Sequence, residues 1–172
     1  MIDRFLQVRR GERTRTALLF LYLFLVVGSY VVTKSTRDAL FLGRFSASRL
    51  PLAGMASAAT VAAVMAVCLR LGPRGSVRTT LTRTLIVFSA SSVAFWALSV
   101  WSAPAWMLPV LYVWAGVYGV LLPAQVWTLA NYVMTTREAK RLVGLVGSGA
   151  ICGWIVGGLL TRASATRLGT PT

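Results

Sequence analysis

The chain has 172 residues, of which 56% are hydrophobic and 13% are charged, and its mean hydropathy is +0.71. This composition excludes an ordinary soluble domain and predicts a polytopic membrane protein. The formal net charge of +14 does not predict a nucleic-acid partner, because the basic residues lie at the ends of apolar runs and no recognition motif accompanies them.

The residue types also give little support to catalysis or metal binding. Histidine, the commonest metal ligand and general base, is absent, and the four acidic residues place no carboxylate pair on one apolar span. Cys68 and Cys152 lie in separate apolar segments without metal-ligand spacing, so we predict two small core residues. We therefore expect no enzyme, no cofactor and no metal site.

Residues 1–16 carry apolar side chains among five arginines and predict an interfacial basic segment. The first span follows at 17–42, where an uninterrupted helix is about 39 Å long, against roughly 30 Å of hydrocarbon core. Its last turns carry Lys34, Arg37 and Asp38, whose spacing puts all three on one helical face.

Ionisable side chains at membrane depth indicate a functional site, because they cost several kcal/mol unless they are paired. A guanidinium beside an ammonium suits phosphate oxygens, so Lys34 and Arg37 are predicted to bind an anion. Asp38 is then a gate or pairing partner that releases a cation when substrate arrives. The alternative is that Lys34 and Arg37 reach the membrane interface and Asp38 pairs with Lys34.

The rest of the chain predicts four more spans and a polar end. These spans cover about 50–71, 81–101, 106–134 and 142–160. We thus expect an all-α helical bundle, with one transmembrane domain at 17–161 and a polar tail at 162–172. Pro123 predicts a kink in the fourth span, and Asn131 further along it is a weaker candidate for lining a substrate path.

Gly149, Gly153 and Gly157 recur every four residues in the fifth span. This spacing predicts a helix face that packs closely against a neighbouring helix. Such packing serves a transporter and a simple helix assembly equally well.

The distribution of basic residues predicts the direction of the spans. Twelve lysines and arginines fall in the amino-terminal segment, the 70–83 connection and the 135–141 connection, against six on the opposite side. The amino terminus is therefore predicted to be cytoplasmic.

Two segments carry a family resemblance. Residues 9–43 read RRGERTRTALLFLYLFLVVGSYVVTKSTRDALFLG, and residues 126–158 read VWTLANYVMTTREAKRLVGLVGSGAICGWIVGG. Both resemble segments of the ATP/ADP translocases, the nucleotide transporters of plastids and intracellular bacteria. The first is similar to the start of that family. The second is similar to its segment in which Trp and Asn precede a Thr, Glu-Ala-Lys-Arg loop and a Gly-rich helix.

The resemblance implies a fold like the major facilitator superfamily, with two six-helix halves around a central site. It implies exchange of ATP for ADP across a bacterial inner (plasma) membrane, with Lys34 and Arg37 as phosphate contacts. Glu138, Lys140 and Arg141 would then have a conformational or folding role, or form a solvated loop.

Five spans make up less than one half of such a transporter. The chain is then an amino-terminal fragment, a truncated relative, or one copy of an assembly with a second half or with itself. The alternatives to nucleotide exchange are a non-transporting membrane scaffold or regulatory module, and a carrier of another organic anion.

Overall fold

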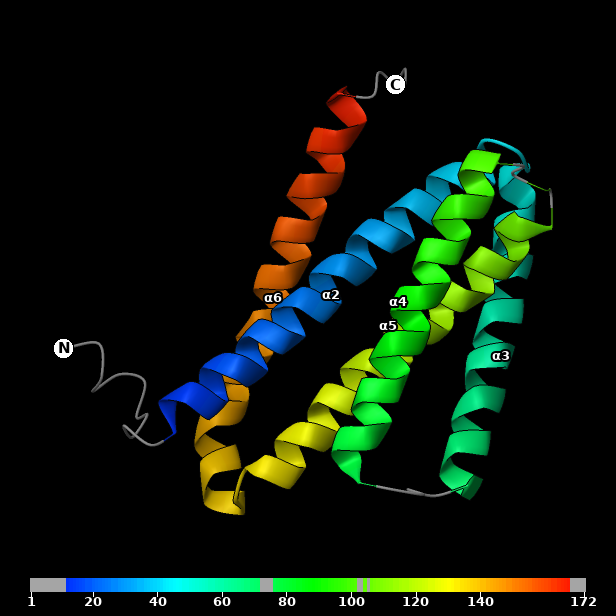
Figure 1. Cartoon of the computed structure of the whole chain (residues 1–172). Helices are drawn as coiled ribbons and strands as arrows, with labels where there is room; N and C mark the ends of the chain where they lie inside the picture. Colours follow the sequence, from blue (N-terminus) through cyan, green and yellow to red (C-terminus); the bar gives the residue numbers. More distant parts are fainter. Residues whose placement is uncertain (1–11, 72–75, 102–103, 105, 168–172) are drawn as a thin grey trace. The chain divides into compact units, whose positions relative to one another are not determined.

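The computed structural model describes residues 12–71, 76–101, 104 and 106–167 (Figure 1). Within these residues, five helices are long and apolar enough to cross a membrane, and no strand is present. They are α2 (Arg13–Leu42), α3 (Leu50–Leu71), α4 (Val77–Trp101), α5 (Met107–Val133) and α6 (Thr136–Arg167), with a short 3-10 helix, η1 (Ala47–Arg49), before α3. The predicted all-α bundle of a multi-pass membrane protein is confirmed.

The helices extend beyond several of the predicted span ends. Helix α3 has the predicted bounds, whereas α2 begins at Arg13, inside the segment predicted to be interfacial. The Thr16 hydroxyl donates to the Glu12 carbonyl oxygen at 2.9 Å, which is consistent with helical backbone before the apolar run starts. Helix α4 begins at Val77 because the Ser76 hydroxyl caps it, accepting from the Thr79 amide at 3.2 Å. The remainder of the predicted interfacial segment, residues 1–11, lies outside the described part.

Helix α6 is longer at both ends than the span predicted at 142–160. It begins at Thr136, within the predicted 135–141 loop, and ends at Arg167, within the predicted polar tail. The hydroxyls of Thr161 and Ser164 donate back to the carbonyl oxygens one turn earlier, each at 2.9 Å. Between Gly158 and Gly169 the sequence has no proline or glycine, and the polar residues at 161–167 do not by themselves end the helix. Residues 168–172 of the tail lie outside the described part.

The chain divides into two compact units. Unit 1 comprises residues 1–33 and 123–172, and unit 2 comprises residues 34–122. Helices α2 and α5 each contribute to both units. Helix α5 is helical on both sides of Pro123, the site of the predicted kink, and the boundary between the units falls there.

The core of unit 1 forms where α2, α5 and α6 meet. Its most deeply buried side chains are Leu23, Val126, Leu142 and Val146. In unit 2, rings of α4 and α5 pack together: Phe88 lies 5.5 Å from Trp114, and Trp114 stacks on Tyr118 at 5.6 Å between centroids. The Trp114 Nε1–H donates to the Ser91 hydroxyl at 3.0 Å, so the ring cluster also satisfies a polar group.

Most apolar side chains of α3 and α4 point outward. In the 18-residue apolar stretch of each helix, only 6% of the residues are buried. Outward apolar surface is the normal state of a helix in lipid, where the hydrocarbon tails are as apolar as leucine. Cys68 and Cys152 are likewise exposed thiols, so the prediction of two core residues was wrong. A lipid-facing position accommodates the small, weakly polar thiol as readily as a core does.

Candidate functional site

The charged face of α2 lies in unit 2, at the end of a continuous helix. Lys34, Arg37 and Asp38 all fall within α2, so they share one face as predicted. Arg37 is buried, with 7% of its surface exposed, while Lys34 and Asp38 are half-buried. A buried cation near the end of an apolar helix must be satisfied by protein groups.

Three interactions hold the Arg37 guanidinium. Its Nε donates to Asp38 Oδ1 at 3.1 Å, and its Nη1 donates to the backbone carbonyl oxygen of Tyr112 at 3.0 Å. Its Cζ also lies 3.9 Å from the centroid of the Tyr112 ring. Arg37 therefore faces α5 inside unit 2.

Aromatic rings close one side of this cluster. Phe41, one turn beyond Arg37, lies 5.3 Å from Tyr112 and 4.9 Å from Phe45 between ring centroids. Arg37 itself is only 7% exposed, and its low-dielectric surroundings strengthen each of its electrostatic contacts. Two of the five N–H donors of Arg37 serve the bonds to Asp38 and Tyr112, which leaves donor positions for a further anion.

Asp38 pairs with Arg37 through a side chain that is 32% exposed. The sequence left open whether Asp38 would serve as a gate or pair with Lys34, and the structure adds Arg37 as its partner. The fourth predicted substrate residue, Asn131, is an exposed residue of α5 in unit 1. It therefore does not belong to the cluster of unit 2.

The predicted glycine face of α6 lies against α2 within unit 1 (Figure 1). A Cβ added at Gly149 would lie 2.5 Å from the Phe20 carbonyl oxygen, and one at Gly153 would lie 2.6 Å from that of Phe24. At Gly157 the nearest atom would be the Gly28 carbonyl oxygen at 2.8 Å. These three positions have no room for a side chain, so the two backbones are in direct contact.

An ion pair links the beginnings of the same two helices. Arg141 Nη2 donates to Glu12 Oε2 at 2.7 Å, and both side chains are largely buried. Beside it, the Glu138 carboxylate accepts from the Thr135 amide at 2.7 Å and from the Thr135 hydroxyl at 2.9 Å. Glu138 and Arg141 thus both have contacts within the protein.

Sequence reasoning missed the partners of these charges. The four-residue pattern Thr-Thr-Arg-Glu at 135–138 is a capping-box signature and could have located the start of α6. Nothing in the sequence distinguishes Tyr112 from the other aromatic residues of its span, because its role depends on a backbone carbonyl. Over the described ranges, no group of three or more potential metal ligands occurs.

No family model, curated protein or solved structure matches this chain.

Proposed function

We propose that this multi-pass membrane protein is a transporter, or the amino-terminal part of one, that exchanges nucleotides such as ATP and ADP by alternating access. The observation that carries the proposal is the buried Arg37, which keeps a guanidinium inside a membrane helix beside Lys34. A cation at this depth is costly, and attraction of an anionic substrate gives it a function. Nucleotide phosphates suit the Arg37 guanidinium best, because a guanidinium donates two parallel hydrogen bonds to a pair of phosphate oxygens.

In this proposal Asp38 substitutes for the phosphate when no substrate is present. The carboxylate neutralises Arg37 in the empty state, and an arriving phosphate displaces it by binding the same guanidinium. Tyr112 then keeps Arg37 oriented through its carbonyl oxygen and ring. Lys34, which is half-buried on the same face, adds a second positive charge. Asn131, an exposed residue of α5 in unit 1, is the weaker candidate for contact with the substrate.

Two other functions follow from particular observations. The close contact of α6 with α2 at Gly153 supports a membrane scaffold or regulatory module whose helices only associate. The same Arg37 supports a carrier of another organic anion. Nucleotide exchange is preferred because the segments at 9–43 and 126–158 both resemble the ATP/ADP translocases.

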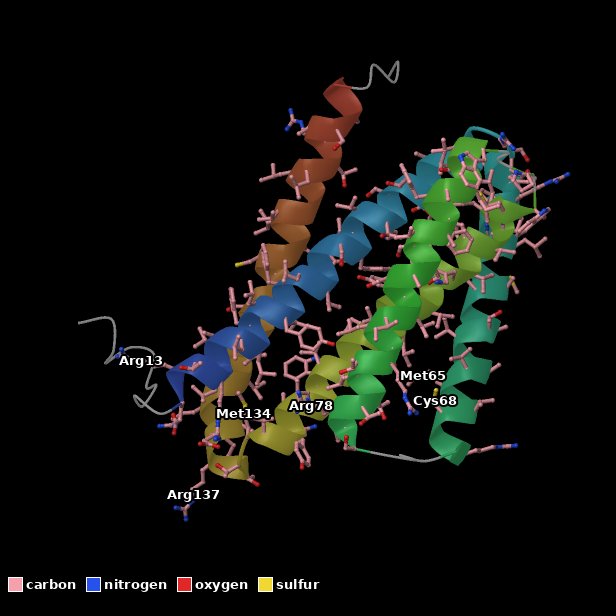
Figure 2. All side chains as sticks on the ribbon, viewed as in Figure 1. Arg13, Met65, Cys68, Arg78, Met134 and Arg137 are labelled. Carbon is pink, nitrogen blue, oxygen red and sulfur yellow. The ribbon has the colours of Figure 1, made fainter. Side chains whose placement is uncertain are left out.

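We place the protein in the bacterial inner membrane with its amino terminus in the cytoplasm. Twelve of the eighteen basic residues support this direction. Within unit 1, Arg13 and Arg137 lie at the same end, where α2 and α6 begin (Figure 2). The partners in the proposal are the lipid bilayer, a nucleotide, and a second transporter half or a further copy of the chain.

Uptake of radiolabelled ATP into proteoliposomes tests the proposal. This chain and the full product of its gene are reconstituted in parallel, with and without ADP inside the vesicles. Uptake that requires internal ADP supports exchange. If correctly inserted protein of both kinds takes up no ATP, nucleotide exchange is rejected, and uptake of other organic anions is measured in the same vesicles.

A further inference from the structure

Unit 2 has a groove of about 320 Å³ at the end where α2 and α4 stop and α5 starts. Figure 1 shows these three helix ends together. The groove is lined by Ala39, Leu40, Gly43, Arg44, Ser99, Pro104, Met107 and Leu108. Its volume lies within the range of small-molecule sites. Its walls are mainly apolar, and Arg44 is the one charged side chain among these lining residues.

Exposed tryptophans identify the membrane depth of the groove. Trp96 and Trp101 near the end of α4 and Trp106 before α5 are 69%, 86% and 59% exposed. Tryptophan collects at the level of the lipid headgroups, where its ring is apolar and its N–H reaches water. Arg44 is also exposed, and it follows the end of α2 at Leu42 by two residues. The groove therefore begins at headgroup level and extends along apolar side chains.

We infer that this groove binds one anionic phospholipid. The phosphate contacts the guanidinium of Arg44, because arginine donates paired hydrogen bonds to phosphate oxygens. The acyl chain lies on Leu40, Met107 and Leu108, which supply the apolar walls. A net negative lipid fits better than a zwitterionic one, because none of the described residues that line the groove carries a negative charge to attract a choline group.

The site is separate from the Arg37 cluster and does not rest on the proposed transport function. Arg37 is buried and contacts Asp38 and Tyr112, whereas Arg44 is exposed and lines the groove. A lipid held between the ends of α2, α4 and α5 would stabilise the arrangement of these helix ends.

Native mass spectrometry of the detergent-solubilised protein tests the inference. The protein is titrated with phosphatidylglycerol and, separately, with phosphatidylcholine of the same acyl chains. We expect one molecule of phosphatidylglycerol to be retained more tightly than the choline lipid. Arg44→Gln should weaken this binding at least about tenfold, because the loss of even one of the paired charge-assisted hydrogen bonds has that effect. Arg49→Gln is the matched control, since Arg49 is an exposed arginine of the same end that does not line the groove.

A second variant tests the apolar part of the groove. Leu40→Trp should partly fill it and also weaken phosphatidylglycerol binding, and it is expected to fold because Leu40 is 43% exposed. Arg44→Lys keeps the positive charge and should retain the preference for the anionic lipid. Equal binding of the two lipids, or equal losses in Arg44→Gln and Arg49→Gln, would overturn the inference. Unchanged binding in a folded Leu40→Trp protein would overturn it as well.

Discussion

Arg37 of α2 donates a 3.0 Å hydrogen bond to the backbone carbonyl oxygen of Tyr112 in α5 and lies over the ring of the same residue. One side chain thus makes a polar and an aromatic contact with a single residue that is 75 positions away. A carbonyl oxygen within a helix already accepts one bond from its own helix, and a guanidinium supplies a second. These contacts connect α2 and α5 within unit 2 and orient the Arg37 guanidinium toward Tyr112.

Arg37→Gln should lower the free energy of unfolding by about 2 kcal/mol, because the half-buried Asp38 carboxylate loses its ion pair and the Tyr112 carbonyl loses a donor. Denaturation in detergent, followed by circular dichroism, measures the change. The exposed Arg49 is the control, and Arg49→Gln should change stability by less than about 0.5 kcal/mol. Equal stability of the two variants would show that Arg37 has no structural role.

Lys34→Ala separates substrate binding from stability better than any change at Arg37, because Lys34 is only half-buried. We expect the variant to fold normally and to bind ATP more weakly by at least about 1 kcal/mol, the contribution of one charge-assisted hydrogen bond. Isothermal titration calorimetry in detergent gives the affinity. Lys140, the other lysine of the chain, is exposed, and Lys140→Ala should leave ATP binding unchanged. A folded Lys34→Ala protein with full affinity would remove Lys34 from the site.

Gly153→Ala should destabilise the protein by about 1–3 kcal/mol, because the new methyl group would lie 2.6 Å from the Phe24 carbonyl oxygen and force α6 away from α2. Thermal unfolding in detergent measures the loss. Gly158 is in the same helix and has no atom within 4 Å of an added Cβ. Gly158→Ala should therefore leave stability unchanged or raise it. If both alanine variants have the same melting temperature, the backbone contact at Gly153 does not stabilise unit 1.

The ion pair between Glu12 and Arg141 should contribute a coupling energy of about 1 kcal/mol in a double-mutant cycle of Glu12→Gln and Arg141→Gln. This coupling energy is larger than that of a typical surface ion pair, because the Glu12 and Arg141 side chains are only 15% and 28% exposed. Urea unfolding in detergent gives the four stabilities. A second cycle with Glu12→Gln and Lys140→Gln uses an exposed cation next to Arg141 that does not line the hollow shared by Glu12 and Arg141, and it should give little coupling. Coupling of equal size in both cycles would point to general charge effects.

Reporter fusions test the proposed orientation. A reporter inserted at the short connection between α5 and α6, next to Thr135, should be cytoplasmic, like one at the amino terminus. A reporter inserted next to Ser46, between α2 and α3, should be on the opposite side. The reason is the excess of basic residues at the amino terminus and around residue 137. The reverse pattern would contradict the orientation and the cytoplasmic amino terminus.

The sequence alone determined the fold class and most of the helix positions. Apolar runs long enough to cross a bilayer predicted five helices, and α3 has the predicted bounds of 50–71. The prediction of helix positions succeeds because a helix in lipid satisfies every backbone hydrogen-bonding group internally. The length and hydropathy of a segment therefore decide which residues form a spanning helix. The spacing of Lys34, Arg37 and Asp38 likewise placed them on one face, since a helix has a fixed period.

Only the tertiary structure decided which groups those residues meet. The partner of Arg37 is the backbone carbonyl of Tyr112, an atom that every residue carries, so no side-chain pattern marks it. The pairing of Glu12 with Arg141 joins residues 129 positions apart, and their approach depends on the contact between α2 and α6. The division of α2 and α5 between two units also has no local signal, because it depends on where distant segments pack. Periodicity is a property of one helix, whereas the choice of partner is a property of the packed chain.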